Sequence, residues 1–302
     1  MFDWKQSWII TLLTLAYMQP AMAFPTECNN WNTVHSDWLW CDDFESDAKL
    51  DADYFEVDRA GGRFGVSTDA AYGGSASLKG IYVTNTNNAG NIKFSFGRTP
   101  VAPTRYLSQD FQDVYWRFYM MVESGWTGNP GKTARITIFS GADWSQAAIG
   151  HLWQDSGLGL ALDPASGVAA DPASSQVITN GYNDFSNLRW LGIQNGVTQV
   201  YSPAYTGKWV CVETRVKLNS PGLADGTFQY WIDDALQTER HDLNWRSSYQ
   251  GYGLNAIFLE NYSIGDNGDQ KARYLDNFVV STSRIGCGSQ AIAPPNPPVN
   301  VH

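Results

Sequence analysis

The sequence feature that most limits the fold is the alternation of apolar and polar residues in short runs. In the stretch 209–218, every second residue from Val210 onward falls on one face, and Trp209, Glu213 and Lys217 fall on the other. A period of two places successive side chains on opposite faces of a β-strand. The run Thr227–Ile232 repeats the pattern after a stretch of turn residues, so the two runs predict a β-hairpin with one buried face.

Helical periodicity is almost absent from the rest of the chain, which consists of similar runs bounded by Gly, Pro, Asn and Asp. We expect strands at Trp38–Phe44, Ala76–Val83, Ile92–Phe96, Val114–Val122, Ala134–Phe139, Ile149–Trp153, Gly159–Leu162, Leu188–Gln194, Trp209–Leu218, Thr227–Ile232, Gly253–Asn261 and Tyr274–Ser281. Short antiparallel strands without crossover helices are typical of two stacked sheets, so we predict an all-β, two-sheet antiparallel β-sandwich of the jelly-roll type. Residues 163–179 are rich in Ala, Ser, Pro and Asp and indicate a long loop.

The two ends of the chain differ in composition from the part between them. The apolar stretch Trp8–Tyr17 is followed by Ala21-Met22-Ala23, which together indicate a signal peptide at residues 1–23. Residues 24–290 then form the predicted jelly-roll domain, and residues 291–302 form a Pro-rich tail or linker. No later apolar run approaches the roughly 18 residues of a membrane helix. We therefore expect a secreted protein, extracellular or periplasmic, with no membrane partner.

Four cysteines fit an oxidising compartment. They allow three pairings. We favour Cys28 with Cys41, which closes a local loop, and Cys211 with Cys287, which ties a strand to the end of the domain. Free, buried cysteines are the alternative. The C-x-x-C spacing of a zinc site does not occur.

The charge balance bears on the possible partners. The net charge is −10, from 30 acidic and 20 basic residues, and the sequence has no basic run. This argues against binding to nucleic acid or to an anionic membrane surface. The 13 Trp and 15 Tyr residues favour a polysaccharide partner, because flat amphipathic rings suit the apolar faces of sugars. The alternative is that many of these rings pack in the core and do not contact a sugar. We expect the protein to be a monomer.

Acidic residues near both ends of the predicted domain suggest a metal site. Asp43 lies on the first predicted strand with Glu45 directly after it, Asp276 lies on the last predicted strand, and these strands often pair in such sandwiches. Carboxylate and carbonyl oxygens are the ligands that Ca²⁺ prefers. The three residues are therefore candidate ligands of a structural calcium ion, and solvated strand ends are the alternative. No organic cofactor is indicated.

The carboxylates do not form an evident glycosidase motif. Jelly-roll hydrolases carry E-x-D-x-x-E, which does not occur here, and Glu239–Asp242 (ERHD) is predicted to be a loop. A glycosidase needs two carboxylates that flank the scissile bond. Only Glu213 and Glu260, on separate predicted strands, could supply such a pair.

Basic and aromatic residues gather in two stretches of this otherwise acidic chain. The first stretch contributes Lys132, Arg135, His151 and Trp153, and the second contributes Tyr182, Arg189, Trp190, Tyr201 and Tyr205. β-Elimination from a uronic acid needs a neutralised carboxylate, a base for the C5 proton and an acid for the leaving oxygen. These residue types can supply the neutralising group, the base and the acid. The alternative interpretation is that the two stretches form a binding cleft or an ordinary sheet surface.

Three segments resemble the concanavalin A-like jelly rolls of the family 14 and family 20 polysaccharide lyases, which cleave alginate and glucuronan. The segment "WVCVETRVKLNSPGLADGTFQYWIDDALQTERHDLNWR" resembles the W-x-x-V-E-x-R-V-K-x-N-T-P-G-x-A-D-G pattern of those enzymes. The segment "VYWRFYMMVESGWTGNPGKTARI" resembles their strand that leads into G-G-K-L-P-G. The segment "FSNLRWLGIQNGVTQVYSPAY" is similar to their F-S-x-R-x-x-W-R segment, which ends in Y-x-Y. The resemblance implies a β-eliminating lyase.

The resemblance also implies roles for individual residues. Lys132 stands at the family's lysine, Ser186 at its serine, and Tyr201 and Tyr205 near its paired tyrosines, while His151 is a candidate for the cleft histidine. Arg189 comes one position later than the family's arginine, which on a strand reverses its face. Glu260 adds negative charge where the family has F-F-G-G.

A secreted polysaccharide lyase is the leading hypothesis, with a non-catalytic glycan-binding module second and a hydrolase third. The candidate catalytic residues are Lys132, His151, Arg189, Tyr201 and Tyr205. The candidate substrate-binding residues are Arg135, Trp153, Ser186, Trp190, Glu213, Arg215, Lys217 and Trp231.

Overall fold

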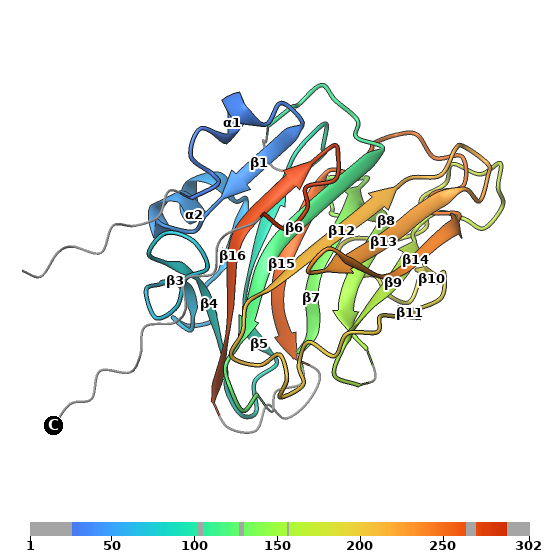
Figure 1. The fold of residues 1–302 in the computed structure, drawn as a ribbon. Helices are drawn as coiled ribbons and strands as arrows, with labels where there is room; N and C mark the ends of the chain where they lie inside the picture. Colours follow the sequence, from blue (N-terminus) through green and yellow to red (C-terminus); the bar gives the residue numbers. More distant parts are fainter. Residues whose placement is uncertain (1–25, 102–104, 127–129, 156, 264–269, 289–302) are drawn as a thin grey trace, which may run out of the picture.

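The computed structural model describes residues 26–101, 105–126, 130–155, 157–263 and 270–288, and within them the chain forms a two-layer sandwich (Figure 1). Two antiparallel sheets of eight strands each pack face to face. Two short helices, α1 (Trp31–Val34) and α2 (Asp47–Asp53), lie at one end of the sandwich. The predicted all-β jelly-roll fold is confirmed.

Sheet A contains the hairpin on which the sequence pattern was clearest. Its order is β14 (Ala235–Leu243), β13 (Gly226–Ile232), β12 (Val210–Lys217), β6 (Asp113–Val122), β16 (Lys271–Ser281), β4 (Ser77–Tyr82) and β3 (Phe64–Ser67), with β1 (Trp38–Asp42) paired to β16. The first and last long segments of the domain therefore lie side by side, as expected.

Sheet B carries the basic and aromatic stretch. Its order is β10 (Arg189–Trp190), β9 (Leu160–Ser166), β8 (Gln146–Gln154), β7 (Pro130–Phe139), β15 (Ala256–Ser263), β5 (Asn88–Ser95) and β2 (Glu56–Asp58), with β11 (Gln194–Asn195) paired to β9. The pairs β8–β7, β7–β15 and β15–β5 are antiparallel and form the centre of the sheet.

The core lies between the sheets because alternate residues of each strand point inward. Trp116 and Phe118 of β6, Val212 of β12 and Ile136 of β7 are all fully buried there. Burial of apolar side chains of this size is the main stabilising contribution to such a fold, about 1.5–3 kcal/mol for each. The period of two in the sequence therefore assigned these inward faces correctly.

Two disulfides tie segments outside the strands to β1 and β12 of sheet A. Cys28 is bonded to Cys41 and Cys211 to Cys287, which confirms the favoured pairing, and no described cysteine is free. The second bond fastens the segment after β16 onto the outer face of sheet A.

The strand predictions fail in some edge segments. Glu239–Asp242 is part of strand β14 and not a loop, because it pairs with β13. The segment predicted as one strand at Leu188–Gln194 instead gives the two short strands β10 and β11. Strands β2 and β3 were not predicted, and the first part of the predicted 163–179 loop continues β9.

The predicted signal peptide and the Pro-rich tail lie outside the described residues. Within the described part of the chain, no helix is long and apolar enough to cross a membrane.

Candidate active site

A β-bulge in β7 determines which side chains reach the outer face of sheet B. Lys132 pairs with Trp153 and Ala134 with Leu152, so Thr133 is an extra residue on β7 relative to β8. A bulge of this kind interrupts the alternation of side chains along a strand. As a result, Lys132 lies on the outer face although Ala134, two residues later, lies in the core.

A polar pocket of about 300 Å³ opens on this face of sheet B. Its wall combines strand residues with residues of the loop that precedes β10. It is lined by Glu56, Asp58, Asn88, Gly90, Asn91, Lys93, Lys132, Tyr182, Asn183, Glu260, Asn261 and Tyr262.

The guanidinium of Arg135 organises one side of the pocket. It is fully buried and donates hydrogen bonds to Glu260 Oε1 at 2.6 Å, to the Tyr182 hydroxyl at 2.7 Å and to Asn183 Oδ1 at 2.7 Å. Lys93 forms a second ion pair, with Glu56. Both of these cations are therefore already matched by a carboxylate.

Lys132 differs from its two cationic neighbours. Among the described residues, it has no carboxylate at ion-pair distance. Its Nζ atom instead lies 4.6 Å from the ring centre of Tyr262, 5.4 Å from that of Phe185 and 5.9 Å from that of Trp153. An ammonium over aromatic rings is attracted by their electron-rich faces.

The surroundings of Lys132 lower the pKa of its amine. Burial of the ammonium lowers the pKa of Lys132 below its ordinary value. Glu260 opposes this shift in pKa, whereas the positive charges of Arg135 and Lys93 reinforce it. Lysines with a lowered pKa serve as general bases.

An aromatic cluster adjoins the polar pocket on the side of β8. The ring of His151 lies 4.0 Å from that of Trp153, 5.6 Å from that of Trp190 and 6.3 Å from that of Phe185, between ring centres. Trp190 is 44% exposed, so the cluster offers an apolar ring surface beside Lys132. Stacking surfaces of this kind are a common way to bind flat molecules.

His151 forms the floor of this cluster. Its Nδ1–H donates to the backbone carbonyl of Asp163 at 2.9 Å, which leaves Nε2 as the unprotonated nitrogen. Burial, and secondly the charge of Arg135, hold the pKa of His151 well below its ordinary value. The imidazole is therefore neutral at neutral pH, and it is covered completely by its neighbours.

Some of the buried polar atoms on this face have no hydrogen-bond partner. Within the described residues, Asn91 Oδ1, Arg135 Nε, His151 Nε2, Trp153 Nε1 and Glu260 Oε2 are buried without a hydrogen-bond partner. Buried polar atoms in folded proteins nearly always have a partner. Ten further buried side-chain atoms of the described residues also lack a partner, so these five atoms do not mark a ligand site by themselves.

Two of the predicted catalytic residues lie elsewhere. Tyr201 is buried between the sheets, where its hydroxyl lies 3.2 Å from Thr133 Oγ1. Tyr205 packs at the edge of the main core. Neither of these tyrosines lines the pocket.

Arg189 and Ser186 also point away from the pocket. Arg189 donates to Ser166 Oγ at 2.8 Å and to the carbonyl of Val168 at 2.7 Å, on the face opposite to that of Trp190. Arg189 therefore lies on the face of β10 that points away from the aromatic cluster. The Ser186 hydroxyl donates to Asp184 within an exposed turn.

The predicted substrate-binding residues of the hairpin lie on the outer face of sheet A. Glu213 is fully buried and accepts hydrogen bonds from the backbone N–H groups of Ile285 and Gly286. Arg215 forms an ion pair with Asp113 at 2.7 Å.

Trp231 and Lys217 share this face of sheet A. Trp231 packs under Arg284, and Lys217 is exposed. Glu213 and Glu260 thus lie on the outer faces of different sheets. The structure does not bring together the carboxylate pair that a hydrolase would need.

The three residues predicted to bind calcium are each hydrogen-bonded within the protein. Asp43 accepts from the Thr26 hydroxyl, Glu45 from Ser75, and Asp276 from the backbone N–H groups of residues 72 and 73. Within the described residues, no group of three His, Cys, Asp or Glu side chains could hold a metal ion. The calcium site stays a prediction.

Sequence reasoning did not select several residues that line the pocket. Tyr262 faces it together with Glu260, because the two are separated by two positions on β15. Lys93 and Asn91 face it for the same reason on β5. The alternation was visible in both strands, but nothing in the sequence indicated that β15 pairs with β7 and that β5 pairs with β15. Asn183 comes from a loop, where no periodicity applies.

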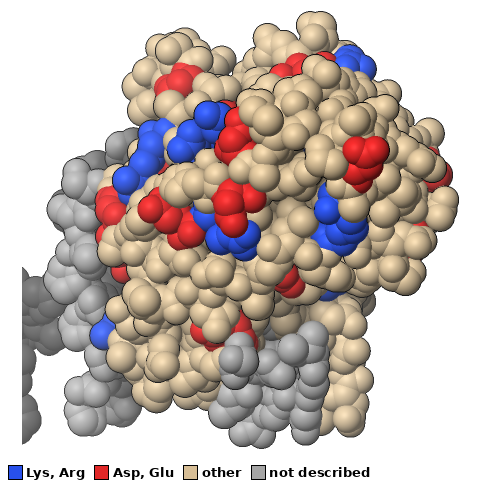
Figure 2. Space-filling view, turned by 90° about the vertical axis from the view of Figure 1, so that its right-hand side faces the viewer, with Lys and Arg blue, Asp and Glu red and all other residues tan. Residues whose placement is uncertain are grey.

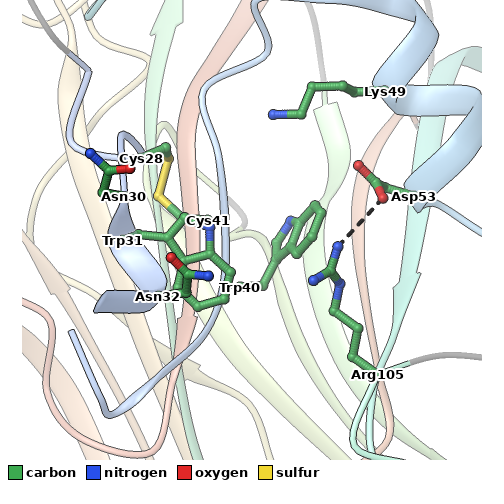
Figure 3. A pocket seen from close by; sticks show the side chains of 9 residues that line it. All are labelled: Cys28, Asn30, Trp31, Asn32, Trp40, Cys41, Lys49, Asp53 and Arg105. Atoms are coloured by element: carbon green, nitrogen blue, oxygen red, sulfur yellow. Dashed lines mark ion pairs between the residues drawn. A yellow bond between two sulfur atoms is a disulfide. The ribbon is translucent and has the colours of Figure 1, made fainter. Parts of the chain in front are cut away.

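A separate pocket of about 260 Å³ lies beside α1 and α2 (Figure 3). Its lining includes the Cys28–Cys41 disulfide. Arg105 forms an ion pair with Asp53 at 3.6 Å and stacks over Trp40, and Lys49 lies 3.6 Å from Asp42 Oδ1. These ion pairs balance the charges in that pocket, in contrast to Lys132 in the sheet B pocket.

The surface at the edge where β14 and β10 end the sheets carries mixed charges. Figure 2 shows basic and acidic side chains next to one another there, separated by wide areas of other residues. Such charges offset one another over short distances. The described residues of this edge therefore form no broad patch of a single sign in this view.

Comparison with known proteins places the fold among polysaccharide lyases. The endo-β-1,4-glucuronan lyase of the fungus Trichoderma reesei matches with a TM-score of 0.55 and 13% identity, over 82% of this chain and 96% of that chain. The PL-14 alginate lyase of Aplysia kurodai matches with a TM-score of 0.56 and 12% identity, over 82% and 99% of the two chains.

An alginate lyase from a Chlorella virus gives a TM-score of 0.56 at 13% identity, over 81% of this chain and 99% of that chain. No protein-family model matches the sequence, and no curated protein matches it. At such low identity, the likeness shows the fold alone. The chain therefore has the jelly-roll fold that these lyases share.

Proposed function

We propose that this protein is a lyase that cleaves a uronate-containing polysaccharide by β-elimination at the sheet B pocket. The observation that carries the proposal is Lys132. It is a half-buried amine with a lowered pKa and no carboxylate partner among the described residues, and it lies between a polar pocket and an aromatic surface. The shared fold with glucuronan and alginate lyases supports the proposal.

Lys132 is the base of the proposed reaction. Its neutral amine removes the C5 proton of the uronate, the C–H electron pair forms the C4–C5 double bond, and the C4–O bond breaks. The leaving oxygen takes a proton from an acid on the protein. His151 lies under three aromatic rings and is fully covered, so it supports the site and does not exchange protons with a substrate.

Tyr262 is the proposed acid. Its ring centre lies 4.6 Å from Lys132 Nζ, and its hydroxyl accepts a hydrogen bond from Asn87 Nδ2 at 3.4 Å, which leaves its own proton free to be donated. Tyr182, on the other side of the pocket, has its pKa raised to about 12 by burial and remains protonated at neutral pH. It serves to hold Arg135 in place.

The uronate carboxylate needs hydrogen-bond donors that stabilise the charge that develops during the reaction. Asn183 lines the pocket; its Oδ1 accepts from Arg135 and its amide donates to the Tyr182 hydroxyl, and the second N–H of this amide would donate to the carboxylate. The buried guanidinium of Arg135 lies directly behind it. We assign the neutralising role to this amide and guanidinium.

The balance of charge in the pocket bears on the substrate. The cations Lys93, Lys132 and Arg135 are offset there by the acids Glu56, Asp58 and Glu260. A chain with a carboxylate on every sugar would meet like charges at these three acids, which disfavours its binding. We infer that the substrate carries uronates separated by neutral sugars.

We place the reaction outside the cytoplasm, because the two disulfides need an oxidising compartment.

A glycan-binding module without catalytic activity is the second candidate function. It is favoured by the exposed ring of Trp190 beside Trp153, a platform that would hold a sugar without any reaction. The acids of the pocket would then act as acceptors for sugar hydroxyls.

The test is incubation with a panel of polysaccharides that includes fully uronic polymers, polymers in which uronates alternate with neutral sugars, and neutral glucans. β-Elimination creates a conjugated, unsaturated uronate, so we expect a rise in ultraviolet absorbance, strongest with the alternating polymers. New reducing ends without this absorbance would contradict the lyase and indicate a hydrolase. Retention on a glycan column with neither signal would indicate the binding module.

A further inference from the structure

A buried guanidinium lies directly behind the proposed active site. Arg273, on β16 of sheet A, is fully buried and points into the interior of the sandwich. Within the described residues, it has no carboxylate at ion-pair distance, whereas the buried Arg117 and Arg135 each have one. Burying a charge without a counter-ion costs several kcal/mol unless hydrogen bonds compensate for it. The hydrogen bonds of the Arg273 guanidinium must therefore compensate for the missing counter-ion, and their partners indicate the role of this residue.

The side-chain hydrogen bonds of Arg273 all go to oxygen atoms of sheet B beneath the pocket, and its guanidinium also lies 5.7 Å from the ring centre of Tyr82. Nε donates to Asn261 Oδ1 at 2.7 Å, and Nη1 donates to Thr133 Oγ1 at 3.3 Å. Nη2 donates to the backbone carbonyls of Lys132, at 3.3 Å, and Glu260. One side chain of sheet A thus joins the two strands of sheet B that carry the proposed base and acid.

The segments that Arg273 holds are irregular ones. Thr133 is the extra residue of the β7 bulge, and its hydroxyl points into the interior, as the side chain of Ala134 does. On β15, the register with β7 shifts between Leu259 and Tyr262. A bulge leaves some of the hydrogen bonds between neighbouring strands unformed, so side-chain hydrogen bonds are needed to stabilise its backbone conformation.

Neighbouring residues complete this support. The Tyr201 hydroxyl lies 3.2 Å from Thr133 Oγ1, and the Tyr82 hydroxyl donates to Asn261 Oδ1 at 3.4 Å. Gly80, which pairs with Arg273, leaves space for this arrangement, because a Cβ atom there would lie 2.8 Å from Asn261 Nδ2.

We propose that Arg273 is a positioning residue, which fixes the bulge at Thr133 and so holds Lys132 toward the pocket. Without the bulge, the alternation along β7 would place Lys132 on the core face with Ala134. The consequence for turnover rests on the proposed function, but the placement of Lys132 can be measured without any substrate.

The first test compares Arg273→Met with Arg117→Met. Arg117 is a matched control: it is also buried, and it contacts Glu27 and the carbonyl of Gly286 on the other side of sheet A. Both variants should unfold at lower temperature. Only Arg273→Met should lower kcat, by about 100-fold with little change in KM, because a small displacement of a reacting group has an effect of this size. Arg273→Lys should recover part of the loss.

The second test follows Lys132 by NMR after ¹³C-methylation of the lysines, with Lys132→Arg used to assign its signal. In Arg273→Met, the pKa of Lys132 should fall further below its ordinary value, because loss of the bulge turns the amine toward the core, and in Arg117→Met it should not move. An unchanged pKa and kcat in folded Arg273→Met would overturn the proposal. If the wild-type protein cleaves no polymer, the proposed function fails while this measurement still decides the role of Arg273.

A milder variant covers the case in which Arg273→Met does not fold. Thr133→Val keeps the shape of the side chain but removes the hydroxyl that Arg273 and Tyr201 contact. Loss of one such hydrogen bond, worth about 1 kcal/mol, corresponds to a decrease in kcat of about fivefold. An unchanged kcat and an unchanged Lys132 signal in this variant would also overturn the proposal.

Discussion

The outer faces of the two sheets are built from similar residues, but their charged groups differ in how they are partnered. On sheet A, Glu213 accepts two backbone N–H groups and Arg215 pairs with Asp113. On sheet B, Lys132 has no carboxylate partner and His151 Nε2 no hydrogen-bond partner among the described residues. The difference teaches that charged residues on a strand do not mark a site by themselves. A site is better indicated by a lysine that lines a pocket, has a lowered pKa and has no carboxylate partner among the described residues.

The largest expected effect distinguishes one lysine of each face. Lys132→Ala should lower kcat by about 10²–10⁴-fold, because it removes the proposed base. Lys217→Ala, on the exposed face of β12, should leave kcat unchanged. The initial rise in ultraviolet absorbance on a cleaved polymer measures both. Equal rates for the two variants would remove the distinction between the faces.

The pH dependence sharpens this prediction. A base must be unprotonated, so kcat/KM should rise about tenfold for each pH unit below the pKa of Lys132 and then level off. Because burial lowers that pKa, the midpoint should lie below the ordinary value for lysine. An amine that neutralised the substrate carboxylate would give the opposite sign, with activity falling as the pH rises through the same midpoint.

The sequence allowed the fold to be predicted more completely than the site. Alternation identified the inward faces of β12 and β13, and turn residues identified their hairpin. It could not show that the outer face of that hairpin is covered, because the covering residues 283–287 come from the far end of the chain. It also could not show the bulge at Thr133, because a bulge depends on pairing with β8 and has no signature in the residues themselves.

The same dependence on distant contacts explains why the sequence pointed to Tyr201 and not to Tyr262 as a residue of the pocket. Tyr201 was selected for its place in a motif, but it lies in the core, where it contacts Thr133. Tyr262 was part of a segment noted only for its departure from the lyase pattern, yet it lies in the pocket beside Lys132. Which residue faces the pocket depends on sheet order, and sheet order is set by contacts between distant parts of the chain.

The next prediction concerns the disulfide of sheet A. Replacing Cys211 and Cys287 by Ser should lower the free energy of unfolding by about 2–5 kcal/mol, since the bond closes a loop of 76 residues. The rate of polymer cleavage should be unchanged at temperatures where the variant is folded, because this bond lies on the face opposite to the pocket.

The other disulfide is the matched control. The Cys28–Cys41 bond closes a loop of only 13 residues, so its removal should reduce stability less. Thermal unfolding followed by circular dichroism measures both losses. A decrease in turnover for the Cys211 and Cys287 variant at full folding would mean that the two faces are coupled.

The smallest expected effect comes from Glu213→Gln. The amide retains the size of the side chain but weakens the hydrogen bonds to Ile285 and Gly286, so the free energy of unfolding should fall by about 1–3 kcal/mol. Denaturant unfolding measures this change, and kcat should not change. A large loss of kcat would instead support a hydrolytic role for this carboxylate.

The bulge at Thr133 has a consequence for how such a site can arise during evolution. A single inserted codon in β7 is enough to move a lysine from the core side of a strand to its open side, because the side chains repeat every two residues. The same insertion leaves the register of Ile136 and Ile138 with β8 intact. An inherited sandwich could therefore acquire or lose its reactive amine in one genetic step, and members of one fold could differ in catalysis while their cores stay alike.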